Sequence, residues 1–171
     1  MSKEIINRVA KSNLITINLE DYYLQGHRTN LDIKDWLDQE LVLKEKEFRE
    51  KLKSFDWSQY KNHFVALQCS SNAIIPAWAY LLIQTYLHGI AKMVVVGSIE
   101  TLESIIYDYT IENLNLDHCK NKPVIVKGCS DKIVPQNAYV KLVNKLQPIA
   151  KSIMYGEACS SVPLYKKRKE L

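Results

Sequence analysis

Three short loops share a cysteine, a following serine and, a few residues later, an aliphatic residue and a proline. They run from Cys69 to Pro76, from Cys129 to Pro135 and from Cys159 to Pro163. Thiolates are ligands that zinc and iron prefer, and metal–sulfur bonds of about 2.3 Å require the thiolates to gather closely. The pattern therefore predicts a metal centre held by Cys69, Cys129 and Cys159.

Such a centre needs a fourth ligand, and the sequence offers Asp131, Glu157, a serine, water, a substrate or a ligand from a partner. An incompletely protein-ligated site is typical of catalysis or transfer rather than of structural zinc. An iron–sulfur cluster is the other cofactor that three cysteines can hold, although the tight C-x2-C spacing of ferredoxins is missing. The cofactor-binding candidates beside the cysteines are Ser70, Ser130, Asp131 and Ser160. The serines are expected first of all to cap backbone groups in their loops.

An internal repeat relates two of these loops. Phe64 to Ser70 aligns with Val124 to Ser130, because each is an apolar run that ends in Cys-Ser. After a loop that is one residue longer in the first copy, a proline and a helical pattern follow in both. The copies cover residues 63–98 and 123–157. A period of about 60 residues exceeds that of solenoid repeats, so it indicates duplication of a supersecondary unit.

Each copy is predicted to form a strand, a loop, a helix and a second strand, and residues 99–114 are predicted to form a linking helix. Two tandem βαβ units predict a three-layer α/β fold with a mostly parallel sheet. With the copies side by side, the leading strands are neighbours at the switch point, where ligands bind at the carboxyl ends. Cys69, Cys129 and Cys159 are then expected at one edge of this sheet, and Cys119 at the opposite edge.

The remaining segments are expected to complete one α/β domain over residues 1–171. Residues 1–62 are predicted to add an antiparallel pair of strands at the sheet edge and a charged surface helix near 43–55. Residues 164–171 are predicted to form a solvated basic tail. The aspartates of this segment are expected to be scattered surface carboxylates. They are Asp21, Asp32, Asp35 and Asp38.

Composition excludes several functional classes. Hydrophobic residues make up 47% and charged residues 25%, which is typical of a soluble domain rather than of a disordered or fibrous chain. The five glycines lack the spacing of GxGxxG, GxxxxGK and GxSxG, so the common nucleotide-binding and serine-hydrolase fingerprints are absent. The net charge of +4 resides mainly in the basic tail, so nucleic acid is not an expected partner.

The cellular location is predicted from the same features. The chain has no apolar stretch long enough to span a membrane and no signal segment at its amino terminus. Four cysteines in such a chain indicate a reducing compartment. We therefore expect a cytoplasmic protein without a membrane partner, and the sequence does not indicate its oligomeric state.

Over nearly its whole length the chain resembles a family of small bacterial proteins catalogued as a domain of unknown function. The matching stretches are Ile15 to Tyr23, Asp32 to Leu37, Lys44 to Glu50 and Lys151 to Glu157 with the following Cys-Ser. The resemblance implies a link to SUF-type iron–sulfur assembly, with assembly proteins as partners. It supports a metal or sulfur role and assigns no reaction.

Two alternatives to the metal site remain open. Cys69 and Cys129 precede helices whose positive ends favour thiolates, so either is a candidate nucleophile or persulfide carrier. Cysteine is also among the most buried residue types, and duplication copies core residues as faithfully as functional ones. The last interpretation is therefore a non-catalytic interaction module with structural cysteines.

Overall fold

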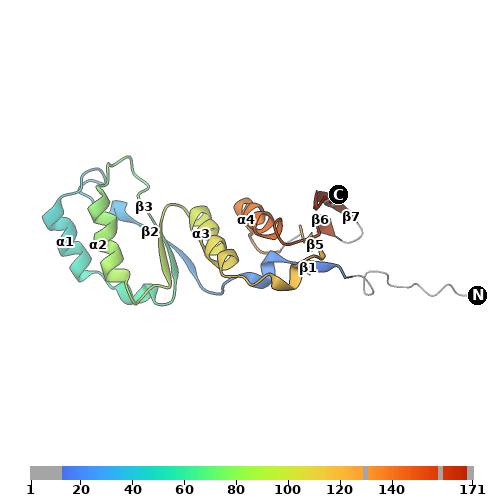
Figure 1. Ribbon diagram of the computed structural model, residues 1–171. Coiled ribbons are helices and arrows are strands. Elements are labelled where there is room, and N and C mark those ends of the chain that lie inside the picture. The colour runs from blue at the N-terminus through green and yellow to red at the C-terminus, as the bar shows by residue number, and fades with distance from the viewer. Residues whose placement is uncertain (1–12, 129–130, 158–159, 169–171) are drawn as a thin grey trace, which may run out of the picture. The chain divides into compact units, whose positions relative to one another are not determined.

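The computed structural model describes residues 13–128, 131–157 and 160–168. The chain forms two compact units, of which unit 1 contains residues 1–23 and 107–171 and unit 2 contains residues 24–106. Unit 1 holds a sheet of order β1-β5-β6-β7, and unit 2 holds a sheet of order β2-β3-β4. Apart from β7, neighbouring strands run parallel (Figure 1). The predicted α/β fold with parallel sheets is therefore confirmed.

Apart from β7, which was not predicted, the regular elements follow the predicted order of strands and helices. Those of unit 2 are β2 (Arg28–Asp32), α1 (Glu45–Ser54), β3 (Phe64–Gln68), α2 (Ala77–Leu87) and β4 (Met93–Val96). Those of unit 1 are β1 (Ile15–Ile17), β5 (Pro123–Val126), α4 (Gln136–Leu146), β6 (Ser152–Glu157) and β7 (Ser160–Lys166). Helix α3 (Ile99–Glu112) starts in unit 2 and ends in unit 1, as expected of the linking helix. Among the described residues, no helix combines the length and apolar character needed to cross a membrane.

Unit 2 has three layers. Every residue of β3 before Gln68 is buried, as expected of a parallel strand covered on both faces. Val65 and Leu67 pack in the same core as buried residues of α1 and α2. Phe64 and Ala66 point to the other face and pack against residues of α3. Figure 1 shows α1 and α2 on one face of this sheet and α3 on the other.

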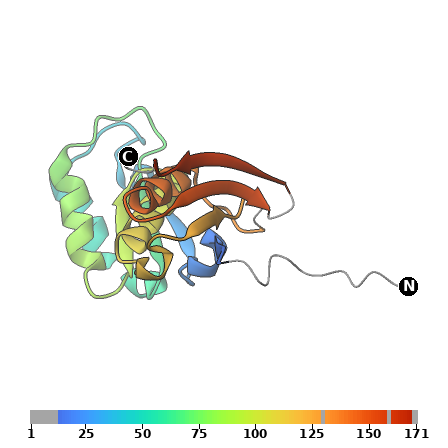
Figure 2. The ribbon, with the colours of Figure 1, turned by 45° about the vertical axis from the view of Figure 1, so that its right-hand side comes forward.

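Unit 1 surrounds a single core. Buried residues of β1, β5 and β6 pack there against the inner face of α4, where Ala138, Leu142 and Leu146 recur at helical spacing. The last two turns of α3 contribute Tyr107 and Ile111. Strand β7 runs antiparallel to β6 and extends the sheet (Figure 2).

The predicted basic tail starts later than the sequence indicated. Residues 164–166 belong to β7, and Tyr165 packs against the core of unit 1. The chain continues past the strand with Lys167 and Arg168, both exposed, while residues 169–171 lie outside the described part of the chain. The run of charges that begins at Lys166 obscured the end of this edge strand.

The two units repeat each other at a constant offset of 59 residues. The strand pairs Val65↔Val94 and Val124↔Ile153 are equivalent at this offset. The turns before the leading strands also match, since Asn62 and Asn121 adopt φ of 63° and 57°. Equivalent backbone hydrogen bonds of 2.8 and 2.9 Å follow, from Lys92 to His63 and from Lys151 to Lys122.

This offset corrects the alignment inferred from the Cys-Ser pairs. The expected one-residue difference between the loops is wrong, because the offset stays at 59 from the turn before each leading strand to the helix after it. Cys69 is consequently equivalent to Gly128, and Ser70 to Cys129. Matching Cys69 to Cys129 by residue identity therefore gives an alignment that differs by one residue from that of the backbone.

The expected single sheet and its antiparallel N-terminal strand pair are also corrected. Strand β1 pairs in parallel with β5, and β2 pairs in parallel with β3. The leading strand of each repeat therefore has a partner on both edges, β2 and β4 for β3, and β1 and β6 for β5. A strand has only two edges, so β3 and β5 cannot be neighbours in one sheet.

A buried ion pair joins β2 to α3 within unit 2. Arg28 Nε lies 2.5 Å from Glu103 Oε1, and both side chains are less than a tenth exposed. The guanidinium also donates to the carbonyl oxygens of Leu24 and Gly26, each at 2.7 Å. These contacts fix the start of the edge strand to the helix that covers the sheet.

We predict that Glu103→Gln lowers the free energy of unfolding by about 3 kcal/mol, because it leaves the Arg28 charge buried without its counter-ion. Urea denaturation followed by circular dichroism measures this loss. The control is Glu45→Gln, which breaks an exposed ion pair with Arg49 and should cost less than about 0.5 kcal/mol. Equal losses in the two variants would contradict the role given to the buried pair.

Candidate functional site

The carboxyl edge of the sheet in unit 2 carries the first cysteine loop. Cys69 directly follows β3 and is half-buried, with its Sγ 3.2 Å from Ser71 Oγ. At the end of the neighbouring strand, Asp32 Oδ1 accepts a hydrogen bond of 3.0 Å from the backbone N–H of Ser70. The edge strand β2 therefore holds the loop that carries the thiol.

The charge of Asp32 is stabilised by this arrangement. Burial is the largest single influence and acts to raise its pKa, but hydrogen bonds from the Ser70 side chain and from the N–H groups of Lys34 and Ser70 outweigh it. The pKa of Asp32 is therefore below its ordinary value of 3.8. The carboxylate contributes a fixed negative charge at the edge of the sheet.

Tyr80, in the first turn of α2, borders the same loop. Burial raises its pKa, and the negative charge of a Cys69 thiolate raises it further. The phenol thus stays neutral and lies close enough to the sulfur to be affected by its charge. Cys69 and Tyr80 both pack against the core of unit 2.

Unit 1 has a glycine where unit 2 has Cys69. A Cβ added to Gly128 would lie 2.7 Å from the ring of Tyr155, so only glycine fits beneath that ring. The Tyr155 ring also meets Tyr139 edge-on, with centroids 5.6 Å apart. Tyr139 is the equivalent of Tyr80 at the offset of 59, so aromatic packing occupies the place that the thiol has in unit 2.

A carboxylate holds the cysteine loop in unit 1 as well. Glu20 Oε1 accepts a hydrogen bond of 2.5 Å from the backbone N–H of Lys132. This bond is the main cause of the lowered pKa of Glu20, to which the Asn18 side chain and the Asp131 backbone also contribute. The predicted cofactor residue Asp131 itself is exposed.

Three predicted site residues, Cys129, Ser130 and Cys159, lie outside the described part of the chain. Their flanking strands are described: β5 and β6 are parallel neighbours, and Val126 pairs with Tyr155 near the carboxyl end of each. Both loops therefore start from the same edge of one sheet. Ser160, also predicted, is the first residue of β7 and is exposed.

The expectation that the three cysteines follow strands of a single sheet is therefore corrected, whereas their joint role as metal ligands stays a prediction. Cys69 follows the sheet of unit 2, whereas the strands before Cys129 and Cys159 belong to the sheet of unit 1. The pairing of β1 with β5 and of β2 with β3 is the physical cause. No group of three or more His, Cys, Asp or Glu side chains suited to a metal ion occurs among the described residues.

Cys119 is a core residue. It is fully buried, and burial raises the pKa of its thiol. At the offset of 59 it replaces Tyr60, which is buried in unit 2. Its exclusion from the predicted cysteine site rested on chain position, and its burial supports a packing role.

Sequence reasoning missed Glu20 and Asp32, and it had placed Asp32 among scattered surface carboxylates. A local signal for both exists. Asn18 directly follows β1 and Asp32 is the last residue of β2, and each side chain accepts from the N–H two residues later and caps a short 3-10 helix. The repetition of this pattern in Asn18-Leu19-Glu20 and Asp32-Ile33-Lys34 marks the strand ends.

Aliphatic side chains are exposed at equivalent positions beside both loops. Ile74 is 94% exposed and its equivalent Ile133 is 79% exposed. The helices that follow expose Leu81 and Val140, which are also equivalent. This repeated apolar surface favours the interpretation as an interaction module, which stays a prediction.

The chain belongs to the family described as "Protein of unknown function (DUF2480)", whose sequence model matches residues 3–167. The resemblance to an uncharacterised family is thereby confirmed, whereas the link to iron–sulfur assembly stays a prediction. No curated protein and no solved structure shows a significant match to the chain.

We predict that Asp32→Asn lowers the free energy of unfolding by about 1 kcal/mol at neutral pH, because a neutral amide accepts the loop N–H bonds more weakly. Because the pKa of Asp32 is lower in the folded state than its ordinary value of 3.8, the carboxylate adds stability above pH 3.8. This stability is lost as the pH falls through the folded-state pKa of Asp32. The difference between the wild type and the variant should therefore shrink below pH 3.8.

Urea denaturation at a series of pH values measures this convergence. Asp35→Asn is the matched control, because Asp35 is exposed three residues further along. A difference between the wild type and Asp32→Asn that stays constant down to the acid limit of folding would contradict the prediction.

Proposed function

We propose that this member of the DUF2480 family binds a zinc or iron ion, or an iron–sulfur cluster, and acts in iron–sulfur assembly or transfer. The observation that carries the proposal is the parallel pairing of β5 with β6. Cys129 follows one of these strands and Cys159 follows the other, so both loops leave one edge of one sheet. Neighbouring strands are about 4.8 Å apart, a spacing that suits two thiolates on one metal ion.

Oxygen ligands are close to the same edge. Glu157 is the last residue of β6, and Asp131 is the first described residue after Gly128. Two thiolates and a carboxylate leave at least one position of a four-coordinate metal for water, a substrate or a thiolate from an assembly partner. An open position suits a protein that receives and passes on a metal or cluster.

The equivalence of the units supports a functional Cys129. The residue at the same offset in unit 2 is Ser70, which is exposed at the carboxyl edge. A cysteine at the equivalent of an exposed position is not explained by core packing. The third predicted ligand, Cys69, follows the sheet of the other unit, so its contribution is a separate question for experiment.

Protein purified anaerobically should contain zinc or iron by elemental analysis, and a cluster would give a visible absorption spectrum. Cys129→Ser and Cys159→Ser should each reduce the metal content at least tenfold, because each removes a thiolate. Cys119→Ala is the control and should keep the metal, since this thiol is buried in the core.

The outcome for Cys69→Ser decides the ligand number. Retained metal indicates a site built from Cys129 and Cys159 alone, and lost metal indicates three cysteine ligands. Protein that contains no metal under anaerobic conditions, or that loses it equally in Cys119→Ala, would refute the proposal.

The second candidate function is persulfide transfer by Cys69. Its sulfur lies within hydrogen-bonding distance of Ser71 Oγ, directly after β3 at the carboxyl edge of the sheet. In the transfer, the Cys69 thiolate attacks the outer sulfur of a donor persulfide and displaces the donor as a thiolate. Cys69 then carries the sulfur as a persulfide, and no oxidant is required.

We predict that a Cys129→Ser/Cys159→Ser variant treated with cysteine persulfide gains one sulfur atom on Cys69, as measured by peptide mass spectrometry. Cys119 is the internal control and should remain unmodified in the folded protein, because its side chain is fully buried. Absence of sulfur on Cys69, or equal modification of the two thiols, would count against the carrier function.

A further inference from the structure

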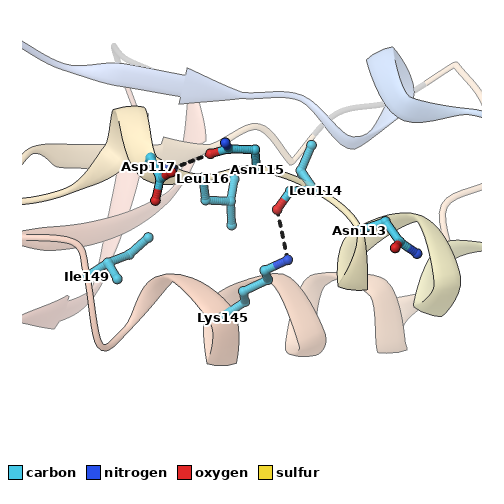
Figure 3. Close-up of a pocket in the computed structure, with 7 residues that line it drawn as sticks. All are labelled: Asn113, Leu114, Asn115, Leu116, Asp117, Lys145 and Ile149. Carbon is cyan, nitrogen blue, oxygen red and sulfur yellow. Dashed lines mark hydrogen bonds between the residues drawn. The ribbon is translucent and has the colours of Figure 1, made fainter.

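A hollow of about 400 Å³ opens in unit 1 beside the end of α3. Its walls are the segment 113–117, Lys145 of α4 and Ile149 after that helix (Figure 3). This volume is within the range of small-molecule sites in proteins, about 300–1,000 Å³. The hollow is separate from the carboxyl edge of the sheet, because it adjoins the turn before β5.

The equivalent place in unit 2 is filled by aromatic rings. At the offset of 59, Leu116 corresponds to Trp57 and Lys145 to Tyr86. The rings of Trp57 and Tyr86 stack with their centroids 5.1 Å apart and their planes inclined by 14°. Phe55, the equivalent of Leu114, packs edge-on against the indole with centroids 4.8 Å apart.

The backbone around this place is the same in both units. Asp56 and Asn115, which are equivalent, each accept a hydrogen bond from the N–H two residues later, at 3.0 and 2.8 Å. A short 3-10 helix follows in each case. The hollow therefore results from the exchange of side chains, because the chain path that supports them is retained.

One buried acceptor shows how unit 1 compensates for the exchange. In unit 2 the indole Nε1 of Trp57 donates to the carbonyl oxygen of Leu52 at 2.9 Å. The equivalent carbonyl, that of Ile111, accepts instead from Lys145 Nζ at 2.7 Å. The lysine has taken over the hydrogen bond of the indole, but it has not replaced the volume of the rings.

Lys145 is held in place by further hydrogen bonds. Its Nζ also donates to the carbonyl oxygens of Glu112 and Leu114, at 2.6 and 2.8 Å, and an ammonium has only three hydrogens. Figure 3 shows the side chain of Lys145 directed at the Leu114 carbonyl. The ammonium is thereby anchored at the end of α3, and it is not offered to an anion.

We propose that this hollow binds an uncharged planar aromatic ring, of the kind that Trp57 and Tyr86 supply in unit 2. The hollow lies where the equivalent residues of unit 2 carry rings, and its walls include the apolar residues Leu116 and Ile149. A ring against Lys145 is attracted by the nearby ammonium. The lining also contains Asp117, whose negative charge is opposite to that of Lys145. A hollow that carries both charges favours a neutral ligand over an ion.

The test uses indole as the probe and the full chain labelled with ¹⁵N. Titration with indole should produce saturable shifts in the amide resonances of residues 113–117 and 145–149, with half-saturation in the millimolar range or below, as expected for so small a ligand. The variant Leu116→Trp/Lys145→Tyr gives unit 1 the two aromatic side chains that unit 2 has at the equivalent positions. It should reduce the affinity for indole at least tenfold by filling the hollow.

A second variant covers the case in which the double substitution prevents folding. Ile149→Phe adds a ring from the other wall and keeps the Lys145 hydrogen bonds, so it should also weaken indole binding. The proposal is overturned by the absence of saturable shifts, by shifts confined to other residues, or by unchanged affinity in folded variants. None of these outcomes depends on the cysteines, so the proposed metal or sulfur function is tested independently.

Discussion

Each leading strand of the duplicated βαβ unit has both of its edges occupied, and the positions of all cysteine loops depend on this pairing. β3 lies between β2 and β4, and β5 lies between β1 and β6. The two N-terminal strands thereby close the edges through which the repeats would otherwise join. The consequence is two sheets, each with its own carboxyl edge and its own loops. They share the order N-terminal strand, leading strand, second strand, and the sheet of unit 1 adds β7.

The duplication extends beyond the βαβ units. Helix α1 and the second half of α3 are equivalent at the same offset and bury side chains at matching positions. The matched buried pairs are Phe48 with Tyr107, Leu52 with Ile111, Tyr60 with Cys119, Ile83 with Leu142 and Leu87 with Leu146. The side chains at matched positions differ in size but are nearly all apolar. Cores tolerate such substitutions when the total volume and the apolar pattern are preserved. Outside these positions the two units carry chemically different side chains, such as Lys145 in unit 1 at the equivalent of Tyr86 in unit 2.

The local parts of the fold could be predicted from the sequence. Helical periodicity gave α2, α3 and α4, and apolar runs bounded by loops gave the strands of both repeats. Strand partners were inaccessible, because Ile15 pairs with Val124 across most of the chain and three residues of β1 carry too little pattern to select a partner. Residue identity also misled the alignment: two Cys-Ser pairs outweighed the weaker but correct match of backbone turns at Asn62 and Asn121.

Of the candidate site, the sequence indicates only the cysteines, whose role as ligands stays a prediction. The carboxylates of Glu20 and Asp32 that hold the loops depend on the strand pairing, so their partners could not be inferred from spacing. The same pairing changes the meaning of the repeated Cys-Ser motif, since Cys69 corresponds to a glycine and Cys129 to a serine. Copying of core residues by duplication therefore does not explain these cysteines.

The cysteines differ instead according to what stands at the equivalent position. Cys119 replaces a buried tyrosine, which is the substitution expected of packing. Cys129 replaces the exposed Ser70, and Cys159 belongs to the connection between β6 and β7, where unit 2 continues into helix α3. Under the proposed function, this difference separates Cys119, a packing residue, from Cys129 and Cys159, the proposed ligands. The proposed metal chemistry is accordingly expected at the carboxyl edge of unit 1.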